Sequence, residues 1–144
     1  MPRLAAYLSF PGNAREAFTH YHDVLGGELN VMTYDQMDTS GFPVQPGPNT
    51  VAHASLVFSG GELAGGDVMD EKDYPLRNTA YSLLYTLDDP DQARRTIDKL
   101  AADGGSQPMP FDLAPWGDWY GQVFDRFGVM WQISVAARAS EEQN

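Results

Sequence analysis

His53 and Asp67 are the first candidates for a catalytic or metal-binding role. They lie fourteen positions apart, each in a segment with strand character. An imidazole can carry a proton or bind a metal, and a buried carboxylate with a raised pKa can act as a general base. One hypothesis is a metal site built from His53, Asp67 and Gln132. The alternative is structural: a histidine hydrogen-bonded within a sheet, and a carboxylate that binds a backbone amide or caps a turn.

An aromatic cluster between residues 111 and 120 is the second candidate for chemistry. It contains Phe111, Trp116, Trp119 and Tyr120, with prolines nearby. Trp and Tyr combine a large apolar face with a polar tip, so in a cleft they would stack on a flat or apolar ligand. The alternative is that they fill the core where prolines prevent regular strand pairing. Nucleophile elbows, phosphate-binding loops with lysine and dinucleotide fingerprints do not occur, so no catalytic residue is assigned.

The first half of the chain predicts a strand, a helix and three further strands. Asn13 and Glu16 form a capping-box pattern, and apolar residues follow at helical spacing until Gly26 and Gly27. The long stretch between this module's second and third strands, residues 35–50, is rich in glycine and proline and predicts a loop. The expected strands are 4–10, 28–34, 51–58 and 62–69, with the helix at 14–25.

The same order of elements then restarts after a polar segment at 70–78. Asp89 and Pro90 predict the start of a second helix. Trp131 alternates with other apolar residues in the last strand and is expected in the core, which places Gln132 on the opposite face. The expected elements are strands 80–87, 106–113, 121–125 and 129–135, an aromatic loop at 114–121 and a polar tail from 136.

Two such modules, residues 1–74 and 75–144, predict an α+β fold. Neither half can close a core alone, so we expect two βαβββ modules that form one curved mixed-sheet domain around a cleft.

Composition restricts the partners. The 144 residues contain 9 Lys and Arg against 20 Asp and Glu, for a net charge of −11 and no cysteine. Such a chain repels nucleic acid and anionic membranes, so neither is expected as a partner. No apolar stretch resembles a signal peptide or membrane span, so a cytoplasmic location is expected.

Four segments, taken in order, carry a family resemblance over nearly the whole chain. It resembles the vicinal oxygen chelate superfamily, which includes glyoxalase I and bleomycin-resistance proteins, and most closely its PhnB-like group. This resemblance implies paired βαβββ modules and a homodimer. The segments are Tyr7 to Phe10 with the helix ending at Gly27, His53 to Leu56 with Asp67, Leu84 to Asp89, and Trp116 to Trp131.

The resemblance also implies where a divalent metal would bind. Metal-using members of the superfamily place one ligand on each of four strands. In this sequence the four positions fall at Ala5 or Ala6, at Ala64 or Gly65, at Ser82 and at Gln132. Of these, only Gln132 offers a plausible donor, and one amide oxygen cannot hold a metal unaided. We therefore expect no resident metal and no other cofactor.

The favoured hypothesis is a protein that binds a small organic molecule in the cleft between the modules. The alternatives are a metal-dependent lyase, isomerase or dioxygenase of the vicinal oxygen chelate type, and a non-catalytic dimeric interaction protein. Whether the chain is an enzyme is left open. The expected ligand-binding residues are His53, Ser82, Trp116, Tyr120 and Gln132.

Overall fold

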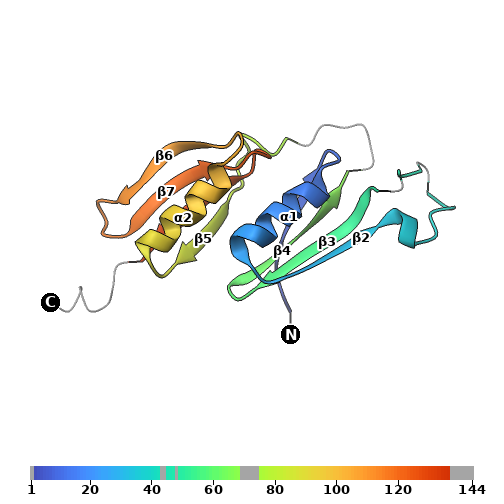
Figure 1. Ribbon diagram of the computed structural model, residues 1–144, viewed down its shortest axis with the longest axis horizontal. Helices are drawn as coiled ribbons and strands as arrows, with labels where there is room; N and C mark the ends of the chain where they lie inside the picture. Colours follow the sequence, from blue (N-terminus) through green and yellow to red (C-terminus); the bar gives the residue numbers. More distant parts are fainter. Residues whose placement is uncertain (1, 43–44, 48, 69–74, 137–144) are drawn as a thin grey trace. The chain divides into compact units, whose positions relative to one another are not determined.

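The computed structural model describes residues 2–42, 45–47, 49–68 and 75–136, which form two compact units that divide between residues 74 and 75. Each unit contains one four-stranded mixed sheet and one long helix (Figure 1). The predicted α+β class, with a strand–helix–strand–strand–strand order in each half, is confirmed. The expected cleft between the modules stays a prediction.

The first unit orders its strands β1-β4-β3-β2, with β1 parallel to β4 and the other pairs antiparallel. A parallel pair needs a crossover between its strands. Here the chain passes through α1, β2 and β3 before β4 joins β1. The elements are β1 (Ala6–Phe10), α1 (Ala14–Leu25), β2 (Glu28–Thr33), the 3₁₀ turn Tyr34–Gln36, β3 (Val51–Phe58) and β4 (Gly61–Asp67).

Helix α1 lies across one face of this sheet and closes the first core (Figure 1). Its residues Ala14, Ala17, Phe18 and Tyr21 are fully buried, as the helical spacing predicts. The predicted capping box at its start is wrong, because Asn13 makes no side-chain cap hydrogen bond. Asp67, the last residue of β4, caps the helix instead.

The second unit repeats the arrangement with strand order β5-β8-β7-β6, again with its first pair parallel. Figure 1 shows α2 lying across one face of this sheet. Burial in β8 alternates strictly, with Trp131, Ile133 and Val135 buried, so the core position predicted for Trp131 is confirmed. The elements are β5 (Leu83–Leu87), α2 (Pro90–Ala101), β6 (Ser106–Leu113), β7 (Trp119–Phe124) and β8 (Met130–Val135).

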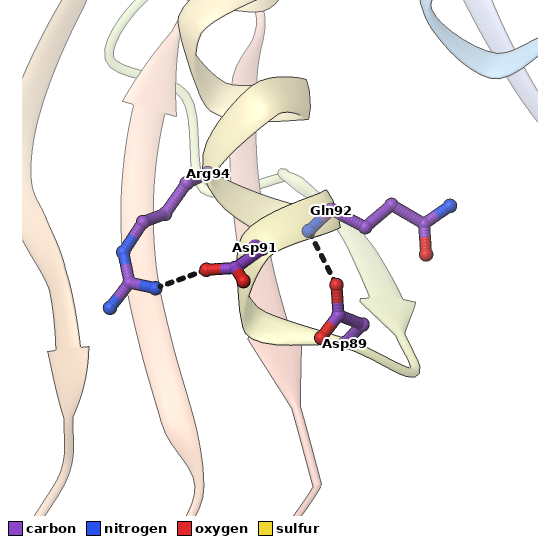
Figure 2. Close-up of polar contacts among 4 residues, drawn as sticks. All are labelled: Asp89, Asp91, Gln92 and Arg94. Carbon is purple, nitrogen blue, oxygen red and sulfur yellow. Dashed lines mark hydrogen bonds and ion pairs between the residues drawn. The ribbon is translucent and has the colours of Figure 1, made fainter.

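The N-terminal turn of α2 is held by two local contacts, drawn in Figure 2. The Asp89 carboxylate accepts a hydrogen bond from the Gln92 backbone N–H at 3.0 Å, and Pro90 occupies the first helical turn. The guanidinium of Arg94 lies 3.2 Å from the Asp91 carboxylate one turn earlier. The predicted start of this helix is therefore confirmed, together with its cap.

The aromatic segment differs most from expectation. Residues 114–121 were expected as a loop, but β7 already begins at Trp119, where it pairs with Leu113 of β6. The expected start of this strand at residue 121 is therefore wrong. The prolines of β6 do not prevent pairing; they coincide with two register shifts that let the strand continue. Strand 80–87 is shorter than expected and begins at Leu83.

Other predictions fall on residues outside those described. They are the polar tail after residue 136 and most of the boundary segment at 70–78. Neither of the two 12-residue helices in the described ranges has the length and hydropathy that a membrane crossing requires.

Candidate ligand-binding site

The second sheet has one face that packs against α2 and one that does not, and we call the latter the open face. Successive side chains of a strand alternate between the two faces. The buried residues of β7 and β8 point toward α2, so Tyr120, Gln122, Gln132 and Ser134 lie on the open face, each half-buried. Gln122 and Gln132 are register partners on adjacent strands.

Four side chains on the open face form a continuous chain of hydrogen bonds, which we call the polar network. The Gln122 amide donates to the Tyr120 hydroxyl at 2.9 Å, and that hydroxyl donates to Oε1 of Gln132 at 2.8 Å. Nε2 of Gln132 then donates to Ser82 Oγ at 2.8 Å. None of the four side chains carries a charge, so the network offers hydrogen bonds without electrostatic attraction for an ion.

A second hydrogen bond continues the polar character of this face. The hydroxyls of Thr86 and Ser134 lie 2.8 Å apart on paired positions of β5 and β8. Ser134 is in turn the register partner of Tyr120. Hydroxyl and amide groups thus span three neighbouring strands.

Exposed apolar side chains flank the polar network. Leu84, the register partner of Gln132, is 68% exposed, and Met109, the partner of Gln122, is 44% exposed. The Trp116 ring is 66% exposed, and its centroid lies 5.9 Å from that of Tyr120. A row of two amides with apolar side chains at both ends, beside an aromatic pair, suits a flat ligand that carries a polar group.

The predicted aromatic cluster is divided between the two faces of the sheet. Trp119 stacks on Phe111 with ring centroids 5.8 Å apart, and Arg94 of α2 lies 5.1 Å from the Trp119 ring. These two rings therefore belong to the helix side, where they pack half-buried beside Arg94, and the prolines of β6 do not prevent its pairing. Trp116 and Tyr120 remain on the open face as candidates for stacking.

His53 lies in the first unit, on the face of β3 away from α1. Its ring centroid is 6.0 Å from that of Tyr7. Partial burial of the Tyr7 hydroxyl raises the pKa of that group, and the neighbouring Tyr34 raises it further. The structure thus joins Ser82, Trp116, Tyr120 and Gln132 in one unit and places His53 in the other. The ligand-binding role of His53 stays a prediction.

The Asp67 carboxylate has a structural role. Its Oδ1 accepts from the Ala14 N–H at the start of α1, and its Oδ2 accepts from the Val51 N–H at the start of β3, both at 2.9 Å. It thereby supplies the helix cap that Asn13 does not. Both oxygens thus have a role in holding the fold together, and the hypotheses that Asp67 acts as a general base or a metal ligand stay predictions. The alternative that Asp67 binds backbone amides is confirmed.

Sequence reasoning missed Gln122, Thr86 and Ser134. Gln122 completes the polar network, and its signal was available: it follows Tyr120 by two positions and so shares its face. Misplacing the start of β7 at residue 121 hid this alternation. Thr86 and Ser134 share strand parity with the expected residues Ser82 and Gln132, respectively.

Comparison with known proteins identifies the family of the chain. Residues 3–133 match the Glyoxalase/Bleomycin resistance protein/Dioxygenase superfamily, and the chain belongs to this superfamily. Among individual proteins, Protein YjdN of Escherichia coli K12 is 30% identical, over 92% of this chain and 94% of its own length.

Two solved structures resemble the chain over almost its whole length. Protein PA1353 of Pseudomonas aeruginosa is 32% identical with a TM-score of 0.76, covering 96% of this chain and 100% of its own. A PhnB protein of Bacillus cereus, described as a putative 3-demethylubiquinone-9 3-methyltransferase, is 26% identical with a TM-score of 0.76. That match covers 94% of this chain and 100% of the other. The predicted likeness to the PhnB-like group is confirmed.

The residues at the superfamily's metal positions do not fit a divalent ion. Ala64 lies at the second position, since a Cβ at Gly65 would stand 2.9 Å from the Phe18 ring on the helix side. The alanines at the first and second positions have no side-chain atom that can bind a metal. The Gln132 oxygen already accepts from Tyr120, and Ser82 accepts from Gln132. Within the described ranges, no three His, Asp or Glu residues are grouped to hold a metal.

Proposed function

We propose that this protein binds a small organic molecule on the open face of its second sheet, with no part played by a resident metal ion. The ligand has a flat apolar part, which lies against Trp116 and Leu84, and at least one group that hydrogen-bonds to the polar network. The observation that carries the proposal is the continuous uncharged network of Ser82, Gln132, Tyr120 and Gln122 beside exposed apolar side chains.

Membership of the superfamily supports this proposal because the superfamily includes bleomycin-resistance proteins as well as enzymes. The enzymatic alternative, a metal-dependent lyase, isomerase or dioxygenase, requires free donor atoms at the metal positions. The two donor-bearing positions, Ser82 and Gln132, instead bond to each other. Binding without metal is therefore the better supported of the two functions.

Calorimetric titration with quinoline, a flat bicyclic aromatic with one acceptor nitrogen, tests the proposal. We expect binding by protein dialysed against EDTA, and at least a tenfold loss of affinity in Gln132→Leu, because the amide is central to the network. Gln92→Leu is the matched control, since Gln92 is exposed on α2 and its side chain points away from Asp89 (Figure 2).

Two outcomes would contradict the proposal. One is binding that disappears with EDTA and returns with manganese or zinc, which would favour the metal-dependent enzyme. The other is equal affinity in Gln132→Leu and Gln92→Leu, which would place the bound quinoline away from the polar network.

A further inference from the structure

Every member of the polar network can both donate and accept a hydrogen bond. Ser and Tyr hydroxyls do both, and the Gln amide has a donor nitrogen and an acceptor oxygen at nearly equivalent positions. A half-turn of each amide about its terminal bond exchanges these two atoms. The hydroxyls of Thr86 and Ser134 on the same face are equally ambivalent, because either can be the donor.

The observed distances suit both directions of the network. The three donor–acceptor separations are 2.9, 2.8 and 2.8 Å. Separations of about 2.7–3.0 Å serve N–H···O and O–H···O hydrogen bonds alike. If both amides turn, Ser82 donates to Gln132, Gln132 donates to Tyr120, and Tyr120 donates to Gln122. The number of hydrogen bonds is three in either direction, so reversal loses none.

The direction decides what the Ser82 end offers to a ligand. In the observed direction Ser82 accepts one hydrogen bond from Gln132, so its own proton and one lone pair are left for a ligand. In the reversed direction that proton is used by Gln132, and Ser82 offers only lone pairs. A turn of two amides thus decides whether the Ser82 end can donate, while it can accept in both directions.

We propose that the polar network is reversible and that its direction controls whether the Ser82 end takes a hydrogen-bond-accepting aromatic molecule, while a hydrogen-bond-donating one is taken in both directions. This inference rests on the proposed function and adds a ligand class to it: neutral flat aromatics whose polar group either donates or accepts. A network held in the reversed direction would take only the donating molecules.

A pair of substitutions at Gln122, at the far end of the network from Ser82, tests the inference. Gln122→Glu introduces a carboxylate that only accepts, which holds the network in the reversed direction. Gln122→Lys introduces an ammonium that only donates, which holds it in the observed direction. The probes are indole, whose ring nitrogen only donates, and quinoline, whose ring nitrogen only accepts. Both are neutral at mildly alkaline pH, so the introduced charges do not attract them directly.

We expect the wild-type protein to bind both probes with dissociation constants within about threefold of each other, measured by ligand-observed NMR. Gln122→Glu should shift the ratio of the two constants about fivefold toward indole, the effect of one hydrogen bond. Gln122→Lys leaves both a proton and a lone pair of Ser82 available, so it should change the ratio by less than about twofold. Tyr120→Phe breaks the middle of the network, so adding it to Gln122→Glu should restore the ratio. This double variant keeps the test valid if Gln122→Lys does not fold.

The failures are distinguishable. If both probes bind and the ratio changes less than about twofold in Gln122→Glu, the reversible network is wrong while the proposed function stands. If wild type binds only one of the two probes, the inference is again wrong. If neither probe binds, the proposed function itself fails.

Discussion

At the scale of single residues, Asp67 shows how one carboxylate joins three elements. It ends β4 and bonds to the first N–H groups of α1 and β3, residues 53 and 16 positions away. Both amides would lose their partner if the carboxylate were removed, and unpaired part-buried amides are costly.

We predict that Asp67→Ala lowers the free energy of unfolding by about 2–3 kcal/mol, since two charge-assisted hydrogen bonds are lost. Urea denaturation measures the loss. Asp88→Ala is the control, because Asp88 is exposed, and it should change stability by less than about 0.5 kcal/mol. Equal stability of the two variants would show that Asp67 is not the cap of α1.

At the scale of elements, the two helices begin in different ways. The Asp89 carboxylate caps α2 within its own turn, whereas Asn13 makes no side-chain bond to α1. We predict that Asp89→Ala costs about 1 kcal/mol of stability and that Asn13→Ala costs less than half of that. Thermal unfolding of both variants gives the comparison. A larger loss in Asn13→Ala would contradict the assignment of the caps.

The close approach of β6 to β7 depends on Gly121. A Cβ at this position would lie 2.7 Å from the Phe111 Cα, too close for two non-bonded carbons. We predict that Gly121→Ala pushes β6 away and lowers stability by about 1–3 kcal/mol. Gly41→Ala is the control, because a Cβ there meets nothing within 4 Å. If Gly121→Ala were as stable as the wild type, β6 could move away from β7 at no cost, which would contradict the prediction.

The sequence predicted elements well wherever local spacing decides them. The apolar spacing of α1, the strand 51–58 and the alternation around Trp131 all agree with the structure. Prediction from the sequence failed where a residue distant in the sequence determines the local structure. Asn13 has the local features of a cap, but Asp67 reaches Ala14 from another strand. The aromatic segment at Trp119 reads as a loop until its pairing with Leu113 is known.

The candidate site was predictable in part for the same reason. Ser82, Gln132, Trp116 and Tyr120 were expected as ligand-binding residues, and the structure places all four in one unit. Gln122 was missed because its strand was expected to begin one residue too late to include Tyr120. That the four expected residues bind a ligand stays a prediction, as do the role of His53, the homodimer and the cytoplasmic location.

At the scale of the whole molecule, charge dominates behaviour in solution. The net charge of −11 at pH 7 keeps chains apart, and it vanishes near the isoelectric point of about 4.4. We predict a solubility minimum close to that pH, measured by turbidity across an acidic pH series. A minimum near neutral pH instead would show that apolar contacts, rather than charge, govern association.

The polar network and Trp116 are proposed to form a ligand-binding surface that works without metal. The most direct measurement is an NMR titration of ¹⁵N-labelled, EDTA-treated protein with quinoline. The signals to follow are the side-chain amides of Gln122 and Gln132 and the indole N–H of Trp116. We predict that these three signals shift together and saturate with one quinoline bound per protein. The indole signal of Trp131 should not shift, because this N–H is bonded to Asp125 in the core. Saturable shifts confined to other residues, or none at all, would contradict the claim.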